Sequence, residues 1–445
     1  MRYRYRSEEE MKDSGVEWIG TIPKKWDTIR NKYVFKEINK KSTNNDENLL
    51  SVSEYYGVAQ RKDKISSDEF LTRAETLEGY KCCEKNDLVM NIMLAWKKAM
   101  GVSSYNGIVS PSYCVYRVLN EDISNPKYYH YLFRIDMYAS IFKQNSTGII
   151  DSRLRLYPEK FYAIYSHNIP KHEQNKIVKF LDEKTAQFDF IISKKEALIQ
   201  RLEEAKKSLI SEVVTGKFKA VKTSDGYKLV ERKKEEMKDS GVEWVKKIPK
   251  NWEVVNGKRI FHQRIDKAME DDEQLTSSQK YGVLLQKDFM RLENQKVVLV
   301  EKDFSILKHV EPNDFVISMR SFQGGLEYSS VRGCISSAYV MIIPSDKVHS
   351  PFFRWFFKSE KYINALRSTS NLIRDGQAMR FSNFVQIPIF IFSKEEQKEI
   401  ADYLDYTIKN IDKLINSTKS QIEKLKEAKQ ALISEAVTGK IEILD

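Results

Sequence analysis

The chain has 445 residues, of which 41% are hydrophobic, and 74 lysines and arginines face 63 aspartates and glutamates. This composition excludes a disordered chain, because enough apolar side chains are present to build folded cores. The net charge of +11 favours an anionic partner, and nucleic acid fits better than a membrane surface.

The sequence carries no sign of membrane insertion or secretion. No apolar run approaches the roughly 20 residues of a membrane helix, and the first letters, "MRYRYRSEEEMKDS", lack the apolar core of a signal peptide. Four cysteines and six histidines are scattered without metal-site or redox-motif spacing. We therefore expect a cytoplasmic protein that holds no metal and no cofactor.

The clearest feature of the sequence is an internal repeat. "MKDSGVEW" at 11–18 recurs letter for letter at 237–244, and "IPKKW" at 22–26 recurs as "IPKNW" at 248–252. "EAKKSLISEVVTGK" at 204–217 recurs as "EAKQALISEAVTGK" at 427–440. The spacing between copies is 237 − 11 = 226 residues at the start and 427 − 204 = 223 at the end. The chain is thus predicted to contain two copies of one unit.

The first part of each copy, about 11–170 and 237–392, is predicted to be a mixed α/β globule. Short β-branched runs such as "NDLVMNIML" and "AYVMIIP" are broken by Gly, Pro, Asn and Asp, as is typical of strands and turns. Residues 126–144 and 351–368 each open with a proline and read as helices. The ends of the two copies are nearly identical and the middles have diverged, which suggests one framework with two different contents.

Each copy ends in a long predicted helix. Residues 171–214 contain neither Pro nor Gly, and about 42 helical residues would extend about 63 Å. One globule would not cover that length, so we expect the two helices to pack on each other. The apolar seam is predicted at Ile177, Leu181, Phe188, Ile191, Leu198, Leu202, Ala205 and Leu209, broken by Lys184 and Lys195. In the second copy it is predicted at Ile400, Leu404, Ile408, Ile411, Leu414, Ile415, Ile422, Leu425 and Leu432, with a polar Thr418.

Catalytic signatures are missing from the sequence. It has no G-x-x-x-x-G-K-[ST] phosphate loop, no G-x-G-x-x-G and no N-P-P-[YF] tetrapeptide. The acidic run "EDDE" at 270–273 reads as a solvated loop. We therefore expect a protein without catalytic activity of its own.

The repeated segments "MKDSGVEWIGTIPKKW", "NIPKHEQNKIVKFLDEKTAQFD" and "EAKKSLISEVVTGK", with their second copies, resemble the specificity (S) subunit of type I restriction–modification enzymes. The resemblance extends over essentially the whole chain. Only "IPIFIFSKEEQKEI" departs from the usual Pro-rich approach to the helix, which affects local geometry there. The resemblance implies two target recognition domains, each of which reads half of a bipartite DNA sequence, and an antiparallel coiled coil that separates them. It also implies that the helical regions bind two methyltransferase (M) subunits, that restriction (R) subunits join this core, and that adenine methylation belongs to the complex.

The expected fold class is α+β, with two mixed α/β recognition domains joined by two long helices in a pseudo-two-fold repeat. The predicted domains are a first recognition domain at 1–170, a first long helix at 171–217, a charged linker at 218–236, a second recognition domain at 237–392, and a second long helix with the tail at 393–445. Gly216 and Gly439 are predicted to cap the helix ends.

Base and phosphate contacts require Arg, Lys, Asn, Gln, Ser or Thr on exposed loops. In the first domain the DNA-binding candidates are Gln60, Arg61, Lys62, Lys64, Trp96, Lys97, Lys98, Ser146, Thr147, Ser152, Arg153 and Arg155. In the second they are Gln286, Lys287, Arg320, Gln323, Ser368, Thr369, Arg374, Gln377 and Arg380. Four repeated tryptophans, Trp18, Trp26, Trp244 and Trp252, are assigned to packing or subunit contact rather than to base stacking.

Two other functions stay open from the residues alone. One is a coiled-coil scaffold without a DNA role, which the basic charge and the divergent polar loops disfavour. The other is a stand-alone DNA-modifying enzyme, which the missing catalytic signatures disfavour.

Overall fold

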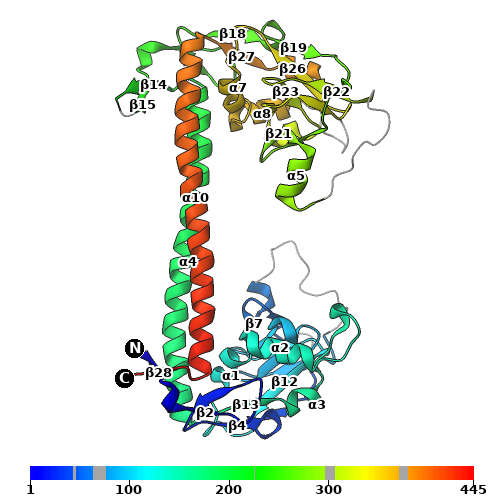
Figure 1. The fold of residues 1–445 in the computed structure, drawn as a ribbon, viewed down its shortest axis with the longest axis vertical. Helices are drawn as coiled ribbons and strands as arrows, with labels where there is room; N and C mark the ends of the chain where they lie inside the picture. The colour runs from blue at the N-terminus through cyan, green and yellow to red at the C-terminus, as the bar shows by residue number, and fades with distance from the viewer. Residues whose placement is uncertain (44–46, 64–76, 225, 296–305, 370–378, 445) are drawn as a thin grey trace. The chain divides into compact units, whose positions relative to one another are not determined.

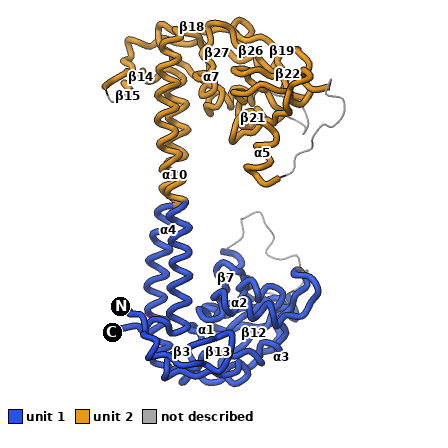
Figure 2. Tube along the Cα trace, viewed as in Figure 1, with its two compact units in different colours: residues 1–195, 420–445 blue, residues 196–419 orange. Residues whose placement is uncertain are grey.

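A computed structural model of the chain describes residues 1–43, 47–63, 77–224, 226–295, 306–369 and 379–444. The chain divides into two compact units, which consist of residues 1–195 with 420–445 and of residues 196–419 (Figure 2). The two long helices, α4 (Lys171–Val214) and α10 (Lys394–Val437), therefore each contribute one part to each unit. Within the described ranges, no helix combines the length and the hydropathy that crossing a membrane would require.

The first unit is a mixed α/β globule packed on its part of the helix pair (Figure 1). Its strands are β1 (Tyr3–Tyr5), β2 (Met11–Asp13), β3 (Thr21–Pro23), β4 (Asp27–Arg30), β5 (Phe35–Glu37), β6 (Leu50–Ser53), β7 (Gly57–Gln60), β8 (Lys81–Cys83), β9 (Leu88–Asn91), β10 (Met100–Val102), β11 (Gly107–Val109), β12 (Tyr113–Val118), β13 (Tyr165–Asn168) and β28 (Ile441–Ile443). Its short helices are α1 (Pro126–Leu132), α2 (Asp136–Gln144) and α3 (Pro158–Ala163). The central antiparallel sheet has the order β10-β9-β12-β5.

The second unit repeats this plan. Its strands are β14 (Phe218–Thr223), β15 (Gly226–Glu231), β16 (Met237–Asp239), β17 (Lys247–Pro249), β18 (Glu253–Asn256), β19 (Phe261–Arg264), β20 (Leu275–Ser278), β21 (Gly282–Leu285), β22 (Lys308–Val310), β23 (Phe315–Ile317), β24 (Glu327–Tyr328), β25 (Gly333–Ile335), β26 (Val340–Pro344) and β27 (Pro388–Ile391). Its helices besides the long pair are α5 (Gln286–Glu293), α6 (Ser321–Gly324), α7 (Ser350–Phe356), α8 (Glu360–Ser368) and α9 (Phe381–Val385). The central sheet here has the order β19-β26-β23-β24.

Both globules have an aromatic core against the central sheet. In the first unit Phe35 is buried, Tyr116 and Phe161 are fully buried, and the ring centroids of Tyr116 and Phe161 lie 4.6 Å apart. In the second unit Phe261 and Phe315 are fully buried, with ring centroids 5.9 Å apart. Burial of rings of this size supplies much of the apolar driving force for each globule.

Each predicted helix in the globules forms as two helices. The first breaks at 133–135 between α1 and α2, and the second breaks at 357–359 between α7 and α8. The break turns Arg134 inward, where its guanidinium donates to the carbonyls of Lys98 at 2.8 Å and Met100 at 2.7 Å. In the second unit the matching Lys358 donates to the carbonyl of Gly324 at 2.9 Å.

The helix pair is antiparallel, and its seam differs in part from the predicted one. In the first unit, Lys195 Nζ donates to Gln421 at 2.6 Å and Lys429 pairs with Asp189 at 2.6 Å, so the sequence runs in opposite directions along the two helices. The seam of α4 follows a heptad through Thr185, Phe188, Ile192, Lys195, Ile199, Leu202, Lys206 and Leu209, all of which are buried or half-buried.

Three predicted seam positions of α4 are wrong by one residue, and Leu414 of α10 is also outside the seam. Ile191 is 43% exposed, Leu198 43% and Leu414 49%, and Ala205 is exposed as well. The heptad places the long lysine Lys206 in the seam instead of Ala205, because its ammonium can reach Asp412 at 2.6 Å. At the other two positions the seam residues are Ile192 and Ile199, which directly follow the predicted Ile191 and Leu198, so the apolar pattern did not distinguish between neighbours.

In each unit the repeated segments pack together at one junction, which we call the frame. It consists of residues 11–26 and 427–440 in the first unit, and of residues 237–252 and 204–217 in the second. In the first unit Gly439 follows α10 with a φ of +75°, and a Cβ there would lie 2.5 Å from Pro23 Cγ. In the second unit Gly216 follows α4 with a φ of +80°, and a Cβ there would lie 2.4 Å from Pro249 Cδ. The start of each copy therefore packs on the end of the helix that belongs to the other copy.

The segment 218–236, predicted as a linker, contains the antiparallel hairpin β14–β15. The first unit has the matching ladder between β1 and β28, which lie at the two ends of the chain, with Tyr3 opposite Ile443 and Tyr5 opposite Ile441. The pairing of β14 with β15 in the second unit thus has a counterpart in the first unit, where β1 pairs with β28 (Figure 1).

Candidate nucleic-acid interface

In the first unit the structure brings two of the predicted DNA-binding segments together. The turn at 92–98 and the loop at 145–156 are joined by a hydrogen bond from Leu156 N to Ile92 O of 2.9 Å. Trp96 lies at this junction, with the ammonium of Lys97 5.1 Å and that of Lys143 4.7 Å from its ring centroid. Indole faces attract cations in this way. The two segments therefore form one basic surface.

The candidate residues in this surface differ in their exposure and in their hydrogen-bond and ion-pair partners. Lys97, Arg153 and Arg155 are exposed, whereas Lys98 pairs with Asp136 at 2.6 Å. Ser146 donates to the carbonyl of Phe142 at 2.7 Å, and Thr147 exchanges backbone hydrogen bonds with Arg155. The backbone of Ser152 lies in a single 3-10 turn, Asp151–Arg153. Of these candidates, Lys97, Arg153 and Arg155 are the ones whose charged groups stay exposed and, within the described residues, form no ion pair with a carboxylate.

A third predicted segment starts at the end of the β6–β7 hairpin. Gln60 and Arg61 are half-buried and Lys62 is exposed, and Lys64 lies outside the described residues. The hairpin turn is held by Arg134, which donates to the carbonyl of Glu54 at 3.0 Å. Burial lowers the pKa of Arg134 to about 10. Sequence reasoning missed this positioning residue, because nothing in a single arginine inside a helical pattern signals an inward turn.

In the second unit the candidates are more dispersed. Arg320, Gln323, Ser368 and Arg380 are exposed, and Thr369 is half-buried with its hydroxyl donating to the carbonyl of Leu366 at 2.8 Å. Lys287 pairs with Glu273 at 2.7 Å. Gln286 is only 6% exposed, so its side chain cannot reach a base in this conformation, and we remove it from the candidate set. Arg374 and Gln377 lie outside the described residues.

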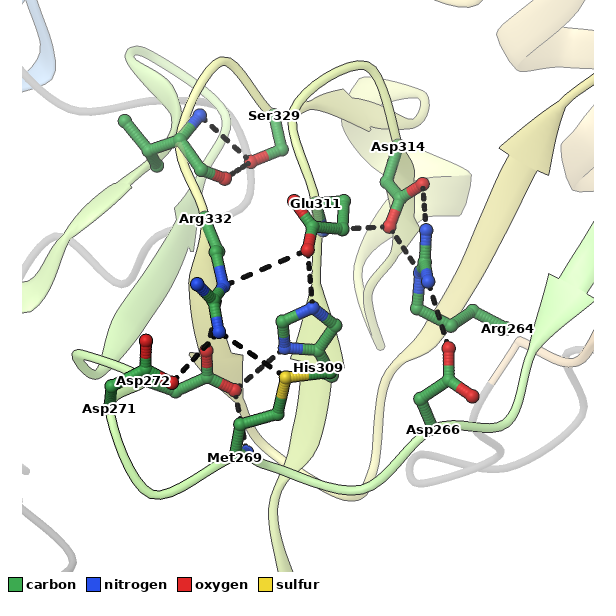
Figure 3. A network of polar contacts seen from close by, with 11 residues as sticks. Arg264, Asp266, Met269, Asp271, Asp272, His309, Glu311, Asp314, Ser329 and Arg332 are labelled. Carbon is green, nitrogen blue, oxygen red and sulfur yellow. Dashed lines mark hydrogen bonds and ion pairs between the residues drawn. The ribbon is translucent and has the colours of Figure 1, made fainter.

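A network of charged side chains supports the second globule (Figure 3). His309 Nδ1 lies 2.7 Å from Asp272 and its Nε2 lies 2.8 Å from Glu311, while Arg332 approaches both carboxylates at 3.5 and 3.7 Å. Asp314 beside this network accepts two hydrogen bonds from Arg264, of 2.6 and 3.1 Å. The acidic run predicted as a solvated loop thus supplies Asp272, which is buried, to the interior.

Both ring nitrogens of His309 face carboxylates, so both act as donors when the imidazole is protonated. Burial lowers the pKa of His309, but the hydrogen bonds with Asp272 and Glu311 outweigh it, and the net effect raises the pKa. A raised folded-state pKa stabilises the fold below the unfolded pKa of about 6.5 and loses that contribution as the pH rises through the folded value.

We therefore expect His309→Gln to lower the melting temperature by about 2–4 °C at pH 6 and by less at pH 8.5. Thermal unfolding of both proteins at the two pH values measures the difference. The matched control is His262→Gln, since His262 is exposed on β19, and it should leave the pH profile unchanged. An equal loss for His309→Gln at both pH values would contradict the assignment of a charged imidazole.

The repeated tryptophans support the frame. Trp26 and Trp252 are each 1% exposed, and their indole N–H groups donate to Glu173 at 2.7 Å and to Glu396 at 3.1 Å. The predicted packing role is confirmed for this pair. In the part of the chain that the structure describes, no group of three or more His, Cys, Asp or Glu side chains is placed to hold a metal ion.

Comparisons with known proteins show what one part of the chain is similar to. Residues 249–424 match the family described as "Type I restriction modification DNA specificity domain". The putative type I restriction enzyme MjaX specificity subunit of Methanocaldococcus jannaschii is 25% identical over 280 residues, which span 62% of this chain and 58% of that relative. The MjaVIII specificity subunit of the same organism is 24% identical over 286 residues, or 62% of this chain and 61% of the relative. The matches thus span about three fifths of the curated relatives.

The fold is also found in solved structures. A chain from "Structural basis underlying complex assembly and conformational transition of the type I R-M system" aligns with a TM-score of 0.67 and 14% identity, over 94% of this chain and 99% of the other. The HsdS subunit from Thermoanaerobacter tengcongensis aligns with a TM-score of 0.52 and 14% identity, over 94% and 98%. At this identity the likeness shows the fold. Residues 249–424 thus resemble a type I restriction–modification DNA specificity domain, and about three fifths of the chain is similar to curated type I specificity subunits.

Proposed function

We propose that the chain is the DNA-reading subunit of a type I restriction–modification enzyme, in which each globule reads one half of a bipartite target. The observation that carries this proposal is the contrast within the repeat. Both frames retain the same contacts, Trp26 with Glu173 and Trp252 with Glu396, whereas the candidate surfaces between them differ in sequence. Two different readers in one framework are what a target of two unlike halves requires.

The frame also supports a partner that binds twice. Asp13, Gly15 and Glu17 are exposed in the first copy, and the identical Asp239, Gly241 and Glu243 are exposed in the second. Some buried positions differ between the copies, as in the pair Leu88 and Phe315. Exposed residues that are identical in the two copies, beside buried residues that differ, are expected where the same partner surface contacts both copies. We assign this role to two methyltransferase subunits, with restriction subunits joining the complex.

The helices would set the distance between the half-sites. Readers on one face of a duplex are typically about 34–36 Å apart, and each helix has 44 residues, or about 66 Å at 1.5 Å per residue. Catalysis would then belong to the partner subunits, because this chain supplies recognition.

Salt-dependent binding tests the proposal. The chain, assembled with the methyltransferase subunit of its own system, should bind duplex DNA with an affinity that falls steeply as salt increases. Arg153→Ala and Arg155→Ala should each reduce the slope of log K against log salt by about 1. The control Lys32→Ala changes an exposed lysine of the first unit outside the candidate surface and should leave the slope unchanged. Binding that does not respond to salt in the assembled complex would favour the scaffold alternative.

A further inference from the structure

The tip of the loop at 145–156 carries two exposed aliphatic side chains. Ile149 is 99% exposed and Ile150 is 52% exposed. Single apolar residues on a surface are common. Two adjacent isoleucines at the tip of a loop that also carries two arginines are a different arrangement, because both lose water contact only if a partner covers them.

The backbone holds this tip in one conformation. Thr147 N donates to Arg155 O at 2.9 Å, and Arg155 N donates to Thr147 O at 3.0 Å, so the loop is closed at its base. Arg153 N donates to Ile150 O at 2.8 Å within the tip. A Cβ on Gly148 would lie 2.6 Å from the carbonyl oxygen of Arg153, so the close turn before Ile149 requires glycine. The exposed side chains are therefore displayed by a constrained turn.

The surroundings of the tip are cationic. Arg153 and Arg155 are exposed on the same loop, and Lys143, whose ammonium lies over Trp96, is exposed at its base. Lys143 also pairs with Asp151 at 2.9 Å, which anchors the tip to α2. This arrangement is complementary to a DNA duplex. The cationic side chains can contact the backbone phosphates, and the apolar side chains can contact the faces of the stacked bases.

From this geometry we infer that Ile149, supported by Ile150, is a wedge that inserts between base pairs of the half-site read by the first unit. The inference rests on the proposed DNA-reading function and deepens it. Aliphatic side chains inserted in this way partly unstack a base step and kink the duplex. Pyrimidine–purine steps unstack most readily, so the wedge gives specificity through deformability at a step that no side chain needs to hydrogen-bond.

The test uses the full chain assembled with its methyltransferase subunit and duplexes that carry 2-aminopurine at successive positions of the target. Apart from the base that the methyltransferase flips out of the stack, the wild-type complex should increase 2-aminopurine fluorescence at one step of the first half-site. Ile149→Ala should abolish that increase and weaken binding about tenfold. The matched control is Ile123→Ala, since Ile123 is 63% exposed in the same unit but outside this loop, and it should change neither quantity.

Three other outcomes are informative. If Ile149→Ala leaves both fluorescence and affinity unchanged, the wedge is excluded. If it weakens assembly with the methyltransferase subunit and spares the fluorescence signal, the isoleucines cover a protein contact and the inference is overturned. If the wild-type complex fails to bind DNA at all, the proposed function fails instead, which separates the two ideas.

Discussion

Gly439→Ala is expected to destabilise the first unit by about 3 kcal/mol, from left-handed strain of about 1–2 kcal/mol and overpacking of about 1–3 kcal/mol. Gly439 has a φ of +75°, and the added methyl group would lie 2.5 Å from Pro23 and 2.8 Å from Trp26. Urea unfolding of the full chain, followed by tryptophan fluorescence, measures the loss. Gly216→Ala should produce a similar loss in the second unit, where Pro249 lies 2.4 Å from the new methyl group.

The matched control for this prediction is Gly20→Ala. Gly20 has a φ of +71°, but a methyl group added there would meet no atom within 4 Å, and the second copy has Lys246 at this position with a φ of +63°. This variant isolates the backbone strain from the steric clash and should cost only about 1 kcal/mol. Equal losses for Gly20→Ala and Gly439→Ala would show that the junction between Gly439, Pro23 and Trp26 does not hold the frame.

Replacing residues 31–164 by residues 257–387 of the same chain is expected to convert the two-part target into one with two identical half-sites. The chain enters and leaves the first segment through β4 and β13, where Arg30 pairs with Tyr165. It enters and leaves the second through β18 and β27, where Asn256 pairs with Pro388. Since both ends of each segment are adjacent, the exchange leaves the frame intact.

The contacts of each segment with the helices are compatible with this exchange. Tyr131 donates to Asp182 of α4 at 2.6 Å, and Trp355 donates to the matching Asp405 of α10 at 2.7 Å. Methylation of host DNA by the exchanged chain, coexpressed with the methyltransferase subunit proposed as its partner, gives the new target. Retention of the original first half-site would contradict the assignment of residues 31–164 as its reader.

The repeated frame could be predicted from the sequence because both copies repeat the same letters at nearly constant spacing. The long helices could be predicted because the segments that form α4 and α10 contain neither Pro nor Gly. The seam of α4 could not be placed fully. Lys206 occupies a seam position and donates to Asp412, while at 191–192 and 198–199 two adjacent apolar residues fit the pattern and the exposed one was selected. Periodicity of apolar letters does not reveal such positions.

The candidate DNA surface was only partly predictable. Residue type identified Lys97, Arg153 and Arg155, which the structure leaves exposed, but it also selected the buried Gln286. Ile149 was not selected, since a search for polar side chains passes over an aliphatic residue at a loop tip. Which residues of a loop face outward depends on its backbone turns, and local sequence does not fix them.

Methylome sequencing of a host that expresses this chain with the methyltransferase subunit proposed as its partner tests the central claim most directly. The account predicts one bipartite methylated motif, two specific half-sites separated by a fixed number of unspecified bases, which disappears when the chain is deleted. A methylation pattern that does not depend on this chain, or a motif without two separated halves, would contradict it.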